Sequence, residues 1–184
     1  VPEGRDLIVV MGGSLGSGVL NDAVASFLEV HSARNDLAVI HISGKQRVAG
    51  PSERNGDDSI WYRRSEFVRA AEDLYAAADL FVGRGGASTV HEVAATGTPA
   101  ILVPWSGASD DHQVANVRWL SDSFGAVLVG DNNPNEVVEA ITTLLEDVEK
   151  RDALSARARE IGAIHHGGLI SKLVLESLAL HDTR

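Results

Sequence analysis

The stretch ADLFVGRGGASTVHEVAATGTPAILVP, residues 78–104, decides the fold. It begins with an apolar run, continues through a glycine-rich loop into a helical segment, and ends in a second apolar run. Gly97 is placed to end the helix, and Pro104 is placed to end the second strand. A helix between two buried strands is typical of a parallel sheet.

The same alternation of short apolar runs and amphipathic segments continues along the whole chain. We expect strands at residues 7–11, 37–42, 59–62, 80–82, 100–103 and 126–129. We expect helices at residues 18–32, 70–78, 88–96, 111–121, 135–149, 151–162 and 167–180, with a loop or frayed helix at 43–57. The pattern predicts one α/β domain, residues 1–184, with a Rossmann-like parallel sheet of about six strands and helices on both faces.

Composition excludes several classes of function. The 184 residues carry a formal net charge of −10, which disfavours binding to nucleic acid or an anionic membrane by bulk attraction. There is no cysteine, so disulfides, thiolate metal sites and cysteine nucleophiles are excluded, and a reducing compartment fits. No apolar run approaches membrane-spanning length.

Ligands of parallel sheets bind at the carboxyl ends of the strands, which here directs attention to five loops. These loops are residues 12–18, 43–46, 62–69, 83–88 and 104–113. The first, GGSLGSG, lies between a strand and a helix, where N–H groups and the helix dipole favour an anion. It lacks the dinucleotide fingerprint, and Val19 and Leu20 occupy the Lys and Ser/Thr places of a P-loop. A simple tight turn is the alternative for this loop.

The second loop, GRGGAST, is a near miss to the dinucleotide fingerprint, with Ser88 in place of its last glycine. Arg84 adds a cation beside the helix start. Ser88 and Thr89 are suited to cap the helix or to donate to phosphate oxygens. Glu92 follows one turn later, toward the buried side of the helix, where it is suited either to bind ribose hydroxyls or to complete a capping box.

The third loop runs into DDHQVAN, residues 110–116. Asp110 or Asp111 is suited to cap the next helix, and His112, Gln113 and Asn116 would form a polar cluster for a hydroxyl-rich ligand. Adjacent residues on a helix point apart, so the run from Asp110 to His112 is not assigned as a metal site.

Three segments together resemble a known family. GGSLGSGVLN (12–21), residues 78–104 and DDHQVAN (110–116) are similar to the C-terminal domain of the MurG family of N-acetylglucosaminyltransferases, which make the lipid-linked precursor of peptidoglycan. The resemblance covers essentially the whole chain. The wider class is the GT-B glycosyltransferases, in which two Rossmann-like domains enclose the active site. One departure is Gly85, where the family often has serine.

The resemblance implies a site for UDP-N-acetylglucosamine. No cofactor is expected, no residue is assigned to a metal, and the sequence does not decide whether a divalent cation takes part. Ser14 would contact the diphosphate, and Arg84 would lie beside it. Ala87 and Ser88 would present backbone N–H groups to phosphate and sugar. The backbone of Val68 would read the uracil edge.

The resemblance also assigns the rest of the donor. Glu92 would bind the ribose hydroxyls. His112 and Gln113 would recognise the N-acetylglucosamine hydroxyls, and Asn116 would support their helix.

The family's N-terminal domain is expected to be absent from this chain. By resemblance it carries the site for the lipid-linked muramoyl-peptide acceptor, the proposed catalytic base and a membrane-facing patch. The full-length protein would then lie on the cytoplasmic face of the cell membrane, and this half alone would be largely inactive.

Four other functions stay open at this point. The chain could be the donor-binding subunit of a two-chain transferase, or a non-catalytic nucleotide-sugar-binding module. UDP-sugar 2-epimerases share the architecture, although the DDHQ segment favours transfer. A Rossmann oxidoreductase is disfavoured because neither glycine loop matches its fingerprint.

Overall fold

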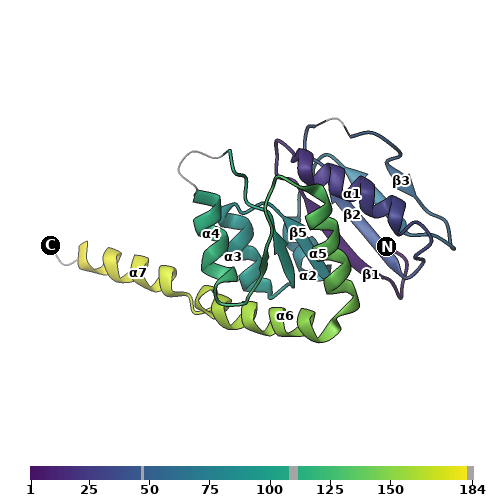
Figure 1. Ribbon diagram of the computed structural model, residues 1–184. Helices are drawn as coiled ribbons and strands as arrows, with labels where there is room; N and C mark the ends of the chain where they lie inside the picture. Colours follow the sequence, from purple (N-terminus) through teal and green to yellow (C-terminus); the bar gives the residue numbers. More distant parts are fainter. Residues whose placement is uncertain (47, 108–111, 182–184) are drawn as a thin grey trace.

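The computed structural model describes residues 1–46, 48–107 and 112–181. Its strands are β1 (Asp6–Met11), β2 (Leu37–Ile42), β3 (Glu53–Arg54), β4 (Trp61–Ser65), β5 (Leu80–Gly83), β6 (Ala100–Leu102) and β7 (Val127–Leu128). Its helices are α1 (Gly18–Val30), α2 (Ala71–Ala77), α3 (Ala87–Thr96), α4 (His112–Ser121), α5 (Pro134–Glu146), α6 (Val148–Gly162) and α7 (Leu169–His181), with a short 3₁₀ turn at Ala163–His165. Each predicted strand and helix has a counterpart (Figure 1).

The sheet has the order β3-β4-β2-β1-β5-β6-β7. The pairs β1–β2, β1–β5, β2–β4, β5–β6 and β6–β7 are parallel. Without β3, this is the 3-2-1-4-5-6 order of doubly wound nucleotide-binding folds. The predicted Rossmann-like architecture is therefore confirmed.

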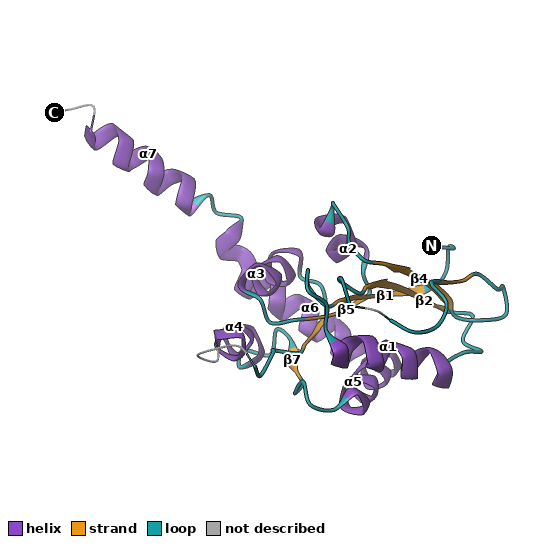
Figure 2. Cartoon of the chain, turned by 90° about the horizontal axis from the view of Figure 1, so that it is seen from above, coloured by secondary structure: helices purple, strands orange, loops and turns teal. Residues whose placement is uncertain are grey.

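Helices cover both faces of the sheet because the strands are apolar on both sides. Ile8 and Val10 of β1 pack with α1 and α5 in one core cluster. Leu7 and Val9 of the same strand pack with α3 and α4 in the other cluster. This alternation is the two-residue period of a strand with two buried faces. Figure 2 shows α1 and α5 on one side of the sheet and α2 and α3 on the other.

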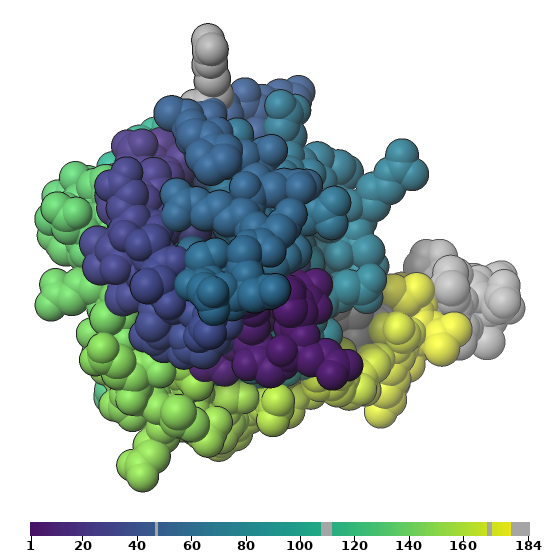
Figure 3. All heavy atoms as spheres, turned by 90° about the vertical axis from the view of Figure 1, so that its right-hand side faces the viewer, coloured from purple at the N-terminus to yellow at the C-terminus, as the bar shows by residue number. Residues whose placement is uncertain are grey.

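The edge of the sheet beyond β2 differs from the prediction. The strand expected at 59–62 begins at Trp61 and continues to Ser65, and the two-residue strand β3 pairs with it in antiparallel fashion. Glu53 and Arg54 are polar and carry no strand pattern, so the sequence did not indicate β3. Figure 3 looks onto this side and shows the blue segment around β3 packed beside α1.

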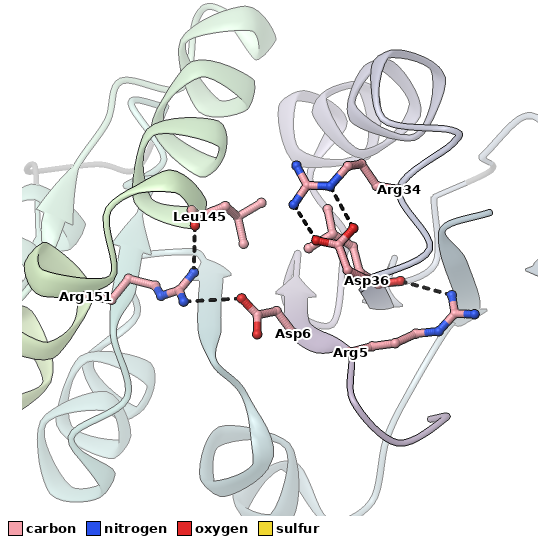
Figure 4. Close-up of polar contacts among 7 residues, drawn as sticks. Arg5, Asp6, Arg34, Asp36, Leu145 and Arg151 are labelled. Atoms are coloured by element: carbon pink, nitrogen blue, oxygen red, sulfur yellow. Dashed lines mark hydrogen bonds and ion pairs between the residues drawn. The ribbon is translucent and has the colours of Figure 1, made fainter. Parts of the chain in front are cut away.

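Charged side chains make polar contacts near the amino ends of β1 and β2, at the end of the sheet opposite the loops predicted to bind ligand. Arg151 of α6 donates to the Leu145 carbonyl oxygen at 3.2 Å and pairs with Asp6 of β1 at 3.2 Å. Arg34 makes two hydrogen bonds to Asp36, just before β2, at 2.6 and 2.7 Å. Figure 4 shows Arg151 joining the helical layer to β1 and the local pair of Arg34 and Asp36 before β2.

Helix α7 extends away from the body of the domain (Figures 1 and 2). Leu173, Val174 and Leu175 are more than half exposed, and neither core cluster described here includes an α7 residue. The folded core therefore ends at about Gly162. In the described parts of the chain, no helix has the length and apolar character needed to cross a membrane.

Gly162 allows α6 to approach α3, and its replacement tests this packing. A Cβ atom at Gly162 would lie 2.0 Å from the Ala94 carbonyl oxygen, which is backbone and cannot rotate away. We expect Gly162→Ala to lower the free energy of unfolding by about 1–3 kcal/mol through overpacking, measured by urea denaturation. Gly167→Ala is the control, because its nearest neighbour would be at 3.8 Å. Equal stability of the two variants would contradict this account.

Candidate functional site

Two glycine-rich loops leave neighbouring strands side by side. Met11 at the end of β1 and Gly83 at the end of β5 are partners in the parallel register. The chain order changes direction between these strands, because β2 and β4 lie on one side of β1 while β5, β6 and β7 lie on the other. Open parallel sheets bind ligands at such a point, beyond the carboxyl ends of the strands.

A cleft of about 610 Å³ lies between the two loops. This volume is within the roughly 300–1,000 Å³ range of small-molecule sites. Its lining comprises residues 12–18 together with Gln46, Arg84, Gly86, Ser88, Thr89, Trp105 and Gln113. Side chains and backbone from four of the five loops singled out by the sequence thus converge on one space.

The first loop is held by local backbone bonds and by close glycine packing. Gly13 and Gly16 have φ angles of 80° and 84°, and Gly16 N–H donates to the Gly13 carbonyl oxygen at 3.0 Å. Gly44 has a φ of 69°, and a Cβ there would lie 2.3 Å from Gly16 N. Ser17 caps α1 by accepting from Leu20 N–H. Ser14 is left exposed at the loop tip and lines the cleft.

The second loop starts its helix earlier than predicted. The N-cap of α3 is Gly86, with no side-chain cap, so the expected capping by Ser88 or Thr89 is wrong. The capping-box role for Glu92 fails for the same reason, since Thr89 occupies the third helical position. The first-turn N–H groups of Ala87, Ser88 and Thr89 therefore lack a side-chain acceptor and are suited to an anion.

Arg84 lies under the cleft, paired with an acid that the sequence did not reveal. Its side chain is 15% exposed and donates to the Val103 carbonyl oxygen at 3.2 Å and to Asp131 Oδ2 at 3.3 Å. Burial lowers the pKa of the Arg84 guanidinium, with Asp131 opposing the shift. Burial acts to raise the pKa of Asp131, but hydrogen bonds from Ser106 and the Arg84 charge outweigh it and leave that pKa lowered. The pair is therefore ionised at neutral pH.

The third loop and the helix that follows it pack against the second loop and are held there by a hydrogen bond. Trp105 N–H donates to Gln113 Oε1 at 2.9 Å, and Asn116 Nδ2 donates to the Gly85 carbonyl oxygen at 3.3 Å. A Cβ at Gly85 would lie 2.9 Å from the Gln113 carbonyl oxygen, so the two segments approach as closely as glycine permits. Asp110 and Asp111, one of which was expected to cap the next helix, lie outside the described residues.

The structure brings together some of the predicted site residues. Ser14, Arg84, Ser88 and Gln113 line the cleft. The others are not among the residues that line it: Ala87 is at the start of α3, Glu92 is on α3, Val68 is in the loop after β4, and His112 and Asn116 are on α4. Glu92 is exposed, so its expected position toward the buried side of the helix is wrong.

Three residues of the site, Gln46, Trp105 and Asp131, were not named as candidates by the sequence analysis. Gln46 and Trp105 lie on loops that the carboxyl-end rule had selected, but nothing in the local pattern marked them. Thr89 does not cap α3 but lines the cleft from the first turn of that helix, and its expected role as a donor to phosphate stays a prediction. Asp131 follows β7, and its pairing with Arg84 joins residues 47 positions apart.

A buried polar chain supports the first loop from behind. His41 of β2 is fully buried, with Nε2 2.9 Å from Asn21 Oδ1 and Nδ1 3.0 Å from the Tyr62 hydroxyl. Burial lowers the pKa of His41 to about 4, with the Arg64 charge acting in the same direction. His41 is therefore neutral in the folded protein at pH 7.

The fold and the cleft define a class. A doubly wound sheet with two glycine-rich loops at the point where strand order reverses is a Rossmann-like fold, the type of domain from which GT-B glycosyltransferases are built. A crystal structure of MurG from Acinetobacter baumannii superposes on 94% of this chain, with a TM-score of 0.73 and 28% identity, and the match covers 51% of that chain.

The family follows from the sequence match. Residues 7–166 match the glycosyltransferase family 28 C-terminal domain, and the chain belongs to this family. It is 34% identical over 171 residues to the Methylococcus capsulatus protein named UDP-N-acetylglucosamine–N-acetylmuramyl-(pentapeptide) pyrophosphoryl-undecaprenol N-acetylglucosamine transferase, covering 92% of this chain and 48% of that protein. A protein of the same name from Paracidovorax citrulli is 38% identical over 151 residues, covering 82% and 42%.

The chain spans about half the length of the curated relatives it matches. A UDP-GlcNAc 2-epimerase from Neisseria meningitidis, solved bound to UDP-GlcNAc, also matches with a TM-score of 0.62. At 12% identity that match concerns the fold alone. The predicted family is confirmed by the family match. The similarity to the epimerase is a similarity of fold.

The low pKa of His41 predicts how stability depends on pH. The unfolded chain binds a proton at His41 below pH about 6.5, whereas the folded chain does so only below about 4. The free energy of unfolding should therefore fall as pH drops between these values, by up to about 3 kcal/mol from this side chain. Burial also lowers the pKa of His31 and His165, which contribute in the same direction.

Urea denaturation across this pH range measures the effect. His41→Gln should flatten the dependence on pH relative to the wild-type chain. An unchanged slope in His41→Gln would refute the assignment of a buried neutral imidazole.

Proposed function

We propose that this chain binds UDP-N-acetylglucosamine as the donor half of an inverting glycosyltransferase. The complete enzyme would transfer N-acetylglucosamine to the lipid-linked muramoyl-peptide precursor of peptidoglycan, at the cytoplasmic face of the membrane. The observation that carries the proposal is the convergence of both glycine loops and Arg84 on one cleft at the β1–β5 junction. The names of the family 28 relatives support the choice of donor and acceptor.

The diphosphate would lie against the first turn of α3. Ala87 and Ser88 would supply backbone N–H groups, Ser14 would contact the phosphates from the first loop, and Arg84 would supply positive charge from below. Uncapped helix N-termini and guanidinium groups are well suited to this anion. The absence of a side-chain cap on α3 supports this placement.

The remaining roles depend on the resemblance more than on the cleft. Val68 would read the uracil edge through its backbone, and Glu92 would accept the ribose hydroxyls. His112 and Gln113 would bind the sugar hydroxyls, with Asn116 holding the start of α4 against the second loop. The hydrogen bond from Asn116 to the Gly85 carbonyl oxygen supports that last role.

The chemistry of this half would be electrostatic. In an inverting transfer the acceptor oxygen attacks the anomeric carbon as UDP departs, so negative charge grows on the diphosphate. Donors already aimed at that charge lower the barrier without reorganising, and each contributes roughly 10²–10³ in rate. The group that removes the acceptor proton would come from the other half of the enzyme. This half alone is expected to bind donor weakly and to turn over little.

Asp131 has a positioning role in this scheme. One of its oxygens accepts from both the Arg84 guanidinium and the Ser106 N–H, the latter at 3.0 Å. A single carboxylate therefore links the cation beneath the diphosphate to the loop that carries Trp105. Its side chain is 9% exposed, which limits competition by water.

Calorimetric titration with UDP-N-acetylglucosamine tests the proposed function. The wild-type chain should bind, and Arg84→Met should weaken UDP binding by roughly tenfold or more while leaving uridine binding unchanged, because uridine lacks the diphosphate. Arg118→Met, which removes an exposed arginine from α4, is the control. A folded wild-type chain that produces no heat at millimolar donor would overturn the proposal.

Replacement of Asp131 tests whether this residue acts by positioning Arg84 or independently of it. Asp131→Asn retains an acceptor for Ser106 but removes the charge that holds Arg84, so UDP affinity should fall by roughly three- to tenfold. In the Arg84→Met background the same change should have little further effect. An equal loss in both backgrounds would show that Asp131 acts independently of Arg84.

A further inference from the structure

Four side chains form a hydrogen-bonded series that runs from β4, the neighbour of β2, to the cleft. The Tyr62 hydroxyl lies 3.0 Å from His41 Nδ1, and His41 Nε2 lies 2.9 Å from Asn21 Oδ1. Asn21 Nδ2 lies 3.5 Å from Gln46 Oε1. The first three side chains are buried, and only Gln46 reaches the cleft surface.

The direction of these hydrogen bonds follows from the Asn21 amide. Its Nδ2 faces Gln46 Oε1 as a donor, so its Oδ1 faces His41 Nε2 as an acceptor. His41 Nε2 therefore carries the proton of the neutral imidazole and donates it to Asn21, and Nδ1 accepts from the Tyr62 hydroxyl.

The Asn21 and Gln46 amides continue this order of donors and acceptors. With its oxygen used by His41, Asn21 offers its Nδ2 hydrogens to Gln46 Oε1. Gln46 is then left with Nε2 as its free end. No hydrogen bond given by the described residues uses that nitrogen. An amide whose oxygen is engaged behind the loop presents a donor, and not an acceptor, to the cleft.

The position of Gln46 places this donor beside the first glycine loop. A Cβ at Gly16 would lie 2.9 Å from Gln46 Cγ, and a Cβ at Gly18 would lie 3.8 Å from its Oε1. The Gln46 side chain thus lies across the N-terminal end of α1. Arg64 also donates to the carbonyl oxygens of Val48 and Ala49, at 3.2 and 3.3 Å, and so holds the segment that follows Gln46.

We propose that Gln46 is a donor to the diphosphate, and that the buried relay from Tyr62 through His41 and Asn21 sets its orientation. This inference rests on the proposed function and adds a specificity-determining residue to it. Asn21, His41 and Tyr62 are positioning residues, since they act through the amide of Gln46.

The direct test compares UDP with uridine on variants of the exposed residue. Gln46→Ala should weaken UDP binding roughly tenfold, as expected for a lost hydrogen bond to a charged group, and Gln46→Glu should weaken it further by placing an acceptor against the anion. Uridine binding should not change in either variant. Asn55→Asp makes the matching amide-to-acid change next to β3 and should leave UDP affinity as in the wild type.

The relay itself is tested by a double-mutant cycle. Asn21→Asp cannot donate to Gln46, so the Gln46 amide should turn its oxygen to the cleft, and UDP affinity should fall toward that of Gln46→Glu. In the Gln46→Ala background the Asn21→Asp change should have little further effect. Tyr62→Phe, which removes the first donor of the relay without adding charge, provides the same cycle if Asn21→Asp fails to fold.

The outcomes separate this inference from the proposed function. If the wild-type chain binds UDP and Gln46→Glu binds it equally well, the donor role of Gln46 is wrong and the donor site stands. If the loss caused by Asn21→Asp or Tyr62→Phe persists in full without Gln46, the relay is wrong. Failure of the wild-type chain to bind UDP would instead remove the proposed function.

Discussion

The parallel pairing of β1 with β5 is the constraint on which the rest of the site depends. Because Met11 and Gly83 are partners at the ends of these strands, the two glycine loops start a strand spacing apart and lead into α1 and α3 on opposite faces of the sheet. Each loop alone would be an ordinary strand-to-helix turn. Their shared starting point makes them the two walls of one cleft.

Close backbone approach holds those walls in place. Gly44 packs against Gly16, and Gly85 packs against the Gln113 carbonyl oxygen, at distances that leave no room for a Cβ atom. The backbone of the loops that border the cleft is therefore fixed by main chain packed against main chain. Such a surface is suited to a diphosphate, which is bound by fixed N–H groups more than by flexible ones.

Polar groups behind the cleft orient the side chains that enter it. Asp131 holds Arg84 and the third loop through one carboxylate oxygen, and His41 joins Asn21 to Tyr62 beneath the first loop. No side-chain polar atom that is buried in the described part of the chain lacks a hydrogen-bond partner. Each buried polar atom of the two networks thus has a hydrogen-bond partner, and such networks in a low dielectric restrain side-chain orientation strongly.

The sequence alone determined the doubly wound sheet, the loops to inspect and the family, because strand periodicity, glycine spacing and the three quoted motifs are all local. It also named Ser14, Arg84, Ser88 and Gln113, which line the cleft, while their contacts with a ligand stay predictions. It misjudged the start of α3, since a glycine N-cap leaves no side-chain signal. Only the tertiary structure decided that Asp131 meets Arg84 and that Gln46 meets Asn21. Those contacts join residues 47 and 25 positions apart, and their distances depend on strand order and helix packing, which no local pattern encodes.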